Sequence, residues 1–250
     1  PKGNAPYMTK PLSSDNSVNV RGAKQESSRR RFLQMAATGT AAGLVSAAGL
    51  KFTPFRVLAQ SKLSPAEALQ ELMEGNKRFA SGKGTSHEQD LAILRQKNIE
   101  KQEPFAAVLS CADSRVPVEL VFDKSIGHLF VARVAGNIVN SEIIASLEYG
   151  AAVLGTKVIM VMGHSGCGAV KATIQAHDVP GQISALYPHI QPAVDQAGTN
   201  LEAATKANAK IQAALLRQSS TVVAGMVKEE KLKVVSAYYD IGSGSVTLLD

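Results

Sequence analysis

After residue 60, short apolar runs alternate with longer stretches of helical periodicity. Apolar runs bounded by polar or turn residues are typical of strands buried on both faces. The pattern predicts strands at residues 105–110, 128–134, 157–163, 232–239 and 245–249. It predicts helices at residues 64–79, 89–98, 141–154, 166–176, 201–216 and 221–230, with a short helical stretch after Pro117.

The order of these elements indicates the fold class. Strands that alternate with helices favour an α/β fold, with a mostly parallel sheet flanked by helices on both faces. The turn residues Ile-Gly-Ser-Gly at 241–244 separate the last two strands. We therefore expect the C-terminal strand to form an antiparallel edge of the sheet. Ser64 and Glu67, with Pro65 between them, form a capping box that begins the first helix.

The first 59 residues do not share this pattern. Residues 1–28 are polar and lack apolar periodicity, which is typical of a disordered tail. We therefore divide the chain into a tail with a signal segment at 1–59 and one domain at 60–250, a length that suits a single core.

Residues 28–34, Ser-Arg-Arg-Arg-Phe-Leu-Gln, resemble a twin-arginine export signal. The apolar residues 35–50 are too few for a good membrane span, which needs about 20 residues. Val57 and Ala59 are small enough for a signal-peptidase site. We expect the twin-arginine machinery to export the domain to a periplasmic or lumenal space, with the signal either cleaved or kept as an anchor. The alternative is a basic tail with an alanine-rich helix.

The net charge of +6 adds little to this interpretation. Much of it lies in the leader and in scattered lysines, and no basic patch carries interleaved aromatic residues. The composition therefore gives no reason to expect nucleic-acid binding.

The chain has two cysteines, and each lies in a polar segment that follows a predicted strand. Cys111 follows the strand at 105–110, and His164 and Cys167 follow the strand at 157–163. Open α/β sheets place their sites at these carboxyl ends. Two thiolates and one imidazole suit zinc and leave a fourth position open. The alternative is two buried free cysteines and a core histidine.

The segments Cys111-Ala-Asp-Ser-Arg115 and Gly-His-Ser-Gly-Cys-Gly at 163–168 resemble those of the β-class carbonic anhydrases. The resemblance covers the chain from Leu63 onward. It implies one zinc per chain on Cys111, His164 and Cys167, where zinc-bound hydroxide attacks CO2 to give bicarbonate and a proton.

The resemblance also implies an Asp113–Arg115 pair beside the metal. Arginine keeps its proton, so it can hold Asp113 ionised and in one orientation. An ionised Asp113 only accepts hydrogen bonds, which would orient the lone pair of a protonated zinc ligand towards the substrate. The alternative is an ordinary surface salt bridge, which contributes little.

Three further residues match the substrate pocket of this family. Gln102 matches a glutamine that donates to the substrate, whereas Phe130 and Tyr149 match wall positions, Tyr149 across a subunit interface. The resemblance thus implies a homodimer or an assembly of dimers. Arg133 matches the arginine of a bicarbonate side pocket, but Val108 stands where the tryptophan of that pocket would be. We therefore expect the open form, with Asp113 held by Arg115.

Two other functions use the same ligands. A zinc-stabilised binding protein without catalysis would need a closed site with four protein ligands. A relative that hydrolyses CS2 or COS would differ in access to its pocket.

Overall fold

The computed structural model describes residues 61–85, 92, 95 and 101–249. The expected export segment and most of the helix expected at 89–98 lie outside these residues. Within the described part of the chain, no helix is both long and apolar enough to cross a membrane.

Five strands form one sheet in the order β2-β1-β3-β4-β5. The strands are β1 (Ala106–Ser110), β2 (Leu129–Arg133), β3 (Val158–His164), β4 (Lys233–Asp240) and β5 (Ser245–Leu248). The first four are parallel, and β5 pairs antiparallel with β4. The predicted α/β fold with an antiparallel C-terminal edge is confirmed.

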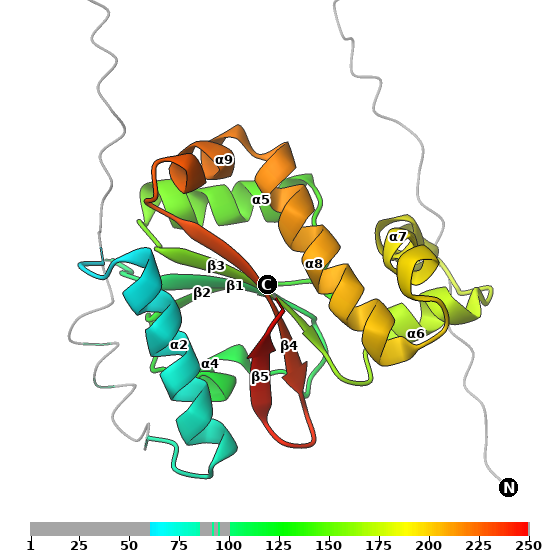
Figure 1. The fold of residues 1–250 in the computed structure, drawn as a ribbon, viewed down its shortest axis with the longest axis horizontal. Helices are drawn as coiled ribbons and strands as arrows, with labels where there is room; N and C mark the ends of the chain where they lie inside the picture. Colours follow the sequence, from blue (N-terminus) through cyan, green and yellow to red (C-terminus); the bar gives the residue numbers. More distant parts are fainter. Residues whose placement is uncertain (1–60, 86–91, 93–94, 96–100, 250) are drawn as a thin grey trace, which may run out of the picture. The chain divides into compact units, whose positions relative to one another are not determined.

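Helices cover both faces of the sheet (Figure 1). One face packs against α2 (Pro65–Ala80) and α4 (Val118–Val121). The other packs against α5 (Ser141–Glu148), α8 (Leu201–Ser219) and α9 (Thr221–Lys228). Beyond the carboxyl ends of the strands lie α6 (Gly168–Gln175) and α7 (Tyr187–Ala197). Three short turns of other helix types complete the described elements: η1 (Ala135–Asn137), η2 (Tyr149–Val153) and η3 (Ile183–Leu186).

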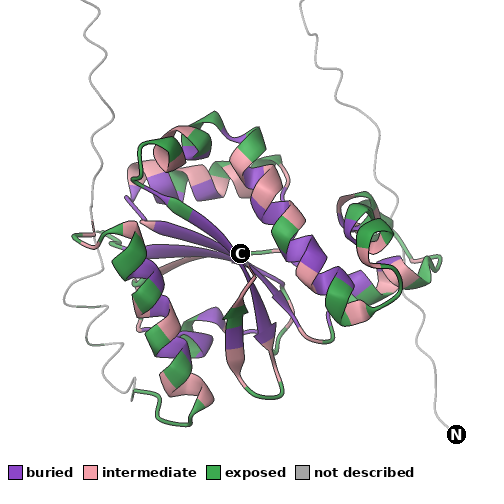
Figure 2. Ribbon diagram, in the orientation of Figure 1, coloured by how far each residue is buried: buried purple, intermediate pink, exposed green. Residues whose placement is uncertain are grey.

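The central strands explain the continuous apolar runs in the sequence. Every residue of β3 is buried, as Figure 2 shows for the middle of the sheet. Met160 and Met162 pack in the core beneath α2, whereas Ile159 and Val161 pack beneath α8. Because successive side chains of a strand point to opposite faces, a strand between two helical layers must be apolar throughout.

The capping box predicted for the first helix is present. The Ser64 N–H donates to Glu67 Oε2 over 2.7 Å, and the Glu67 N–H donates to Ser64 Oγ over 3.2 Å. These two bonds satisfy N–H groups that have no partner within the helix, so α2 begins where the sequence predicts.

Asn76 on α2 joins three elements through one buried amide. Its Nδ2 donates to the carbonyl oxygens of Val121 and Gly244 over 3.0 and 2.9 Å. Its Oδ1 accepts from the Val246 N–H over 2.8 Å. The side chain thereby links α2 to α4 and to the β4–β5 hairpin.

We expect Asn76→Leu to lower the free energy of unfolding by roughly 2–4 kcal/mol, because three backbone groups, two of them buried, lose their partner. Urea denaturation of the full chain measures this. Gln70→Leu, on the exposed side of α2, is the control. A change no larger than the control's would contradict the assigned role of Asn76.

Two helices of the structure differ from those predicted from the sequence. Helix α7 was not predicted, because Pro188 and Pro192 usually interrupt helices. In the structure Pro188 lies in the first turn, where no N–H is needed, and Pro192 is accommodated inside the helix. The helix expected at 141–154 ends its α-helical part at Glu148 and continues as the π-helical turn η2.

Candidate metal centre

Cys111, His164 and Cys167 meet at the carboxyl edge of the sheet. Cys111 directly follows β1, His164 ends β3, and Cys167 precedes α6. Because β1 and β3 are neighbours in the sheet, residues distant in sequence come together. One ligand atom from each residue lies within 4.8 Å of the other two, and all three residues are buried. Both cysteines are free thiols.

The tight turn between His164 and Cys167 depends on Gly166. Its φ of +66° lies in the left-handed region, which residues with a Cβ rarely adopt. The turn brings Cys167 back towards His164 at the start of α6. The sequence Gly-His-Ser-Gly-Cys therefore has a geometric reason for its second glycine.

The ring of His164 is held in a form that suits metal binding. Its Nδ1 lies 3.0 Å from the Ser165 carbonyl oxygen, which can only accept, so Nδ1 carries the hydrogen. Its Nε2 is buried and has no hydrogen-bond partner among the described residues. A buried nitrogen with an unused lone pair is costly unless a cation takes it. These residues thus fit a metal ion.

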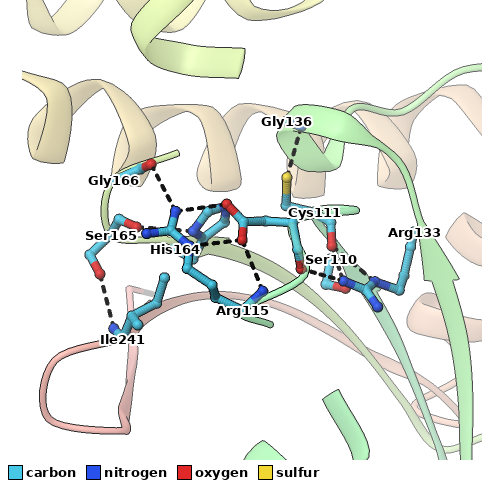
Figure 3. A network of polar contacts seen from close by, with 10 residues as sticks. Ser110, Cys111, Arg115, Arg133, Gly136, His164, Ser165, Gly166 and Ile241 are labelled. Atoms are coloured by element: carbon cyan, nitrogen blue, oxygen red, sulfur yellow. Dashed lines mark hydrogen bonds and ion pairs between the residues drawn. The ribbon is translucent and has the colours of Figure 1, made fainter. Parts of the chain in front are cut away.

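Ser165 is itself fixed by the end of β4. Its N–H donates to the Tyr239 carbonyl over 2.9 Å. Its Oγ accepts from the Ile241 N–H over 2.9 Å (Figure 3). The β4–β5 hairpin therefore orients the His164 ring through the Ser165 backbone. The sequence analysis did not identify this support.

The two thiols behave as one coupled pair. A hydrogen bond from the Cys167 thiol lowers the pKa of Cys111 to about 4. The same contact, together with burial, raises the pKa of Cys167. The pair thus loses its first proton readily and retains the second. A cation that binds both sulfur atoms would displace that second proton.

Asp113 and Arg115 form a two-pronged pair, as the sequence analysis expected. Arg115 Nε donates to Asp113 Oδ1 over 3.0 Å, and Nη2 donates to Oδ2 over 2.8 Å. These hydrogen bonds hold the pKa of Asp113 below its usual range. Asp113 Oδ2 lies 3.8 Å from the free Nε2 of His164, so the ionised carboxylate stands beside the candidate metal site.

Arg133 at the end of β2 holds the backbone of the same loop. Its Nε donates to the Cys111 carbonyl over 3.0 Å, and its Nη2 donates to the Asp113 carbonyl over 2.6 Å. These bonds fix the segment that carries both a ligand and the ionised carboxylate (Figure 3). The family resemblance matches Arg133 to an anion pocket and does not predict this contact, although the place of Arg133 at a strand end was a signal.

The three residues expected in the substrate pocket lie away from the ligands of their own chain. Gln102 is exposed and precedes β1, so about 17 Å of strand separates it from Cys111. Phe130 pairs with Ala107 near the amino end of β1. The Tyr149 ring lies 6.3 Å from the Phe130 ring and is 45% exposed. The structure thus brings Phe130 and Tyr149 together but not to the cluster of Cys111.

Known proteins are similar to this chain in sequence. The family model described as carbonic anhydrase matches residues 106–246. The carbonic anhydrase of Mycolicibacterium smegmatis is 32% identical over 193 residues, which are 74% of this chain and 93% of that protein. Carbonic anhydrase 2 of Mycobacterium tuberculosis is 30% identical over 195 residues, 75% of this chain and 94% of that protein.

Solved structures agree with the sequence matches. The β-carbonic anhydrase CcaA superposes with a TM-score of 0.57 at 26% identity, over 73% of this chain and 87% of that chain. The Coccomyxa β-carbonic anhydrase in complex with acetazolamide has the same TM-score and identity, over 72% and 86% of the two chains. Both matches extend over most of residues 60–250.

Proposed function

Because the chain belongs to the β-class carbonic anhydrases, we propose that it reversibly hydrates CO2 to bicarbonate and a proton at one zinc ion held by Cys111, His164 and Cys167. The observation that carries the proposal is the buried, unpaired Nε2 of His164 beside two buried sulfur atoms. Zinc at such a site supplies a water that loses its proton far more readily than bulk water, chemistry for which carbonic anhydrases are the standard example.

The proposed role of Asp113 is to orient the reacting group that is bound beside His164. An ionised carboxylate only accepts hydrogen bonds, so Asp113 takes one from a protonated group bound beside His164 Nε2. The lone pair of such a group would then point away from Asp113 and towards CO2. Arg115 keeps Asp113 in place through both oxygens, and its own backbone N–H adds a third bond to Oδ1 over 3.0 Å.

We also propose that the resting enzyme keeps Asp113 on Arg115 rather than on the metal. Arg133 already donates to two carbonyl oxygens of the Cys111–Asp113 segment. Val108 is fully buried in β1 and offers no donor to an anion. The side pocket that would stabilise a closed form in this family therefore lacks its second donor.

Three substrates separate the alternatives. We expect stopped-flow assays of the zinc-loaded full chain to show CO2 hydration well above the uncatalysed rate and slow or no hydrolysis of COS and CS2. Faster turnover of CS2 or COS than of CO2 would favour the hydrolase function. No turnover of any of them by fully zinc-loaded protein would favour a non-catalytic zinc-stabilised binding protein.

We propose that the active unit is a homodimer, or an assembly of dimers, whose pockets form between subunits. Phe130 and Tyr149 lie away from the cluster of their own chain, and Tyr149 is exposed although its ring makes a tilted contact with that of Phe130. An aromatic wall that is remote from its own metal site can serve the site of a second copy. Gln102, also exposed, would act in the same way.

Complementation between two inactive variants tests shared pockets. We expect Asp113→Asn and Tyr149→Ala each to lower CO2 hydration. When the two variants are co-expressed, each hybrid dimer should contain one site with both residues intact and so regain the activity of up to one normal site. In that hybrid, the chain with intact Asp113 receives Tyr149 from its partner. If activity only equals the mean of the two parents, each pocket is built within one chain.

We propose export by the twin-arginine route, on the basis of residues 28–34. That route carries folded proteins, so zinc can bind both thiols before the oxidising compartment is reached. Replacing Arg29 and Arg30 with Lys should retain full-length precursor in the cytoplasm, measured by fractionation and immunoblotting. Replacing Lys2 and Lys10 with Arg is the control. Full-length wild-type protein confined to the cytoplasm would refute the proposal.

A further inference from the structure

The loop after β2 holds one of the candidate ligands by a backbone hydrogen bond. The Gly136 N–H donates to Cys111 Sγ over 3.3 Å (Figure 3). Gly136 has a φ of +73°, and a Cβ there would lie 2.7 Å from Ile190 Cδ1. The neighbouring Asn137 is also left-handed, with a φ of +44°. Such a loop needs support from outside itself to keep its N–H aimed at the sulfur.

That support comes from two amides on α8. Asn208 Nδ2 donates to the Gly136 carbonyl over 2.8 Å. Gln212, one turn further along, donates to Asn208 Oδ1 over 3.2 Å and to the His189 carbonyl over 2.8 Å. Its Oε1 accepts from the Val139 N–H over 2.7 Å. Asn208 and Gln212 are 0% and 1% exposed.

These bonds run in a continuous series from the helix to the sulfur atom. Gln212 fixes Asn208, Asn208 fixes the carbonyl of Gly136, and the N–H of the same residue reaches Cys111 Sγ. The amides are buried, so water does not compete for these bonds. An N–H that donates to a thiolate withdraws electron density from it and fixes its direction, and such outer contacts tune metal sites.

We propose that Asn208, braced by Gln212, is a positioning residue for the ligand Cys111. By holding the Ala135–Asn137 loop, it keeps the Gly136 N–H on the sulfur atom. This contact fixes the direction of the sulfur, and the fixed position raises the affinity of the site for its metal by more than the weaker electron donation lowers it. This inference rests on the proposed zinc function and assigns part of the zinc affinity to a residue remote from the metal.

A matched control exists in Asn76, which is as buried as Asn208 but belongs to the opposite helical layer. It bonds backbone groups of α4 and the β4–β5 hairpin and none of the Ala135–Asn137 loop. Asn76→Leu and Asn208→Leu are therefore the same chemical change at two buried amides, of which one leads to Cys111.

The experiment compares metal affinity and ligand spectrum in the full chain. Zinc affinity is measured by competition with a chelator, and the Co²⁺-substituted protein reports the sulfur-to-metal charge-transfer band. We expect Asn208→Leu to weaken zinc binding about 10–100-fold. It should also shift the band to longer wavelength, because the thiolate becomes a stronger donor without its N–H partner. Asn76→Leu should lower the thermal midpoint and leave the band position unchanged, because Asn76 bonds the hairpin behind His164 and none of the loop that carries the Gly136 N–H.

Each outcome decides the inference. Unchanged zinc affinity and band position in Asn208→Leu would overturn it, as would an equal band shift in Asn76→Leu. If Asn208→Leu does not fold, Asn208→Ala, which adds no bulk, takes its place under the same criteria. Failure of the wild-type chain to bind zinc would instead overturn the proposed function.

Discussion

Cys167→Ser is expected to lose its zinc and nearly all CO2 hydration. Serine keeps the shape of cysteine but is a poor zinc ligand, because its hydroxyl does not ionise near neutral pH. Cys167 is fully buried, and among the described residues the cluster contains no fourth His, Cys, Asp or Glu side chain that could replace it. Zinc affinity should fall by well over 100-fold, because even outer contacts of metal sites are worth about 10–100-fold.

The same variant should also be less stable, because a bound metal stabilises only the folded chain. Zinc content by elemental analysis, thermal midpoint and CO2 hydration are measured on one preparation. Val158→Thr is the control: it adds a polar group to a fully buried position at the amino end of β3, in the core cluster beneath α2 and outside the cluster of the three ligands. Full zinc occupancy with normal turnover in Cys167→Ser would disprove the assigned ligand set.

Asp113→Asn should abolish most of the turnover while leaving the zinc in place. The amide cannot accept through two equivalent oxygens, and its Nδ2 would face the donors of Arg115. We expect a loss of roughly 100-fold or more in kcat/KM, typical of removing one preorganised electrostatic contact. Asp113 is not part of the Cys-His-Cys cluster, so zinc content should stay near one per chain.

The pH dependence of the wild-type chain follows from the same pair. Because Arg115 holds the pKa of Asp113 below its usual range, the carboxylate stays ionised as the pH falls through the ordinary aspartate range. Protonation of Asp113 should therefore not limit CO2 hydration between about pH 5 and 8.

Asp195→Asn, the same change at an exposed position of α7, is the control for Asp113→Asn, and its kcat/KM should match that of the wild type. An Asp113→Asn variant with wild-type kcat/KM would show that the carboxylate has no part in the reaction.

The fold was predictable where local signals and tertiary packing agree. The all-apolar β3 and the capping box at Ser64 each have one strong interpretation, and both are confirmed. Helix α7 was not predicted, because whether a helix tolerates Pro192 depends on its packing against α8. The π-helical turn at Tyr149–Val153 was not predicted either; it places Gly150 against the Phe130 ring, which a Cβ would approach within 3.1 Å.

The ionisable residues of the candidate site could be predicted from the sequence, but the groups that hold them in place could not. Two cysteines at two strand ends restrict the ligand set, so Cys111, His164 and Cys167 follow from the sequence. The Gly136 N–H and the Ser165 carbonyl are backbone groups, which sequence motifs do not distinguish from any others. Asn208 is one of several polar residues on α8, and only the folded loop shows which of them faces the site.

A zinc titration of metal-free full-length protein tests the central claim most directly. Zinc is added in steps, and CO2 hydration is followed by stopped flow together with bound zinc. If zinc on Cys111, His164 and Cys167 performs the reaction, the rate rises in proportion to bound zinc and levels off at one ion per chain. Full hydration activity before any zinc is added, or no activity at one bound zinc per chain, would contradict it.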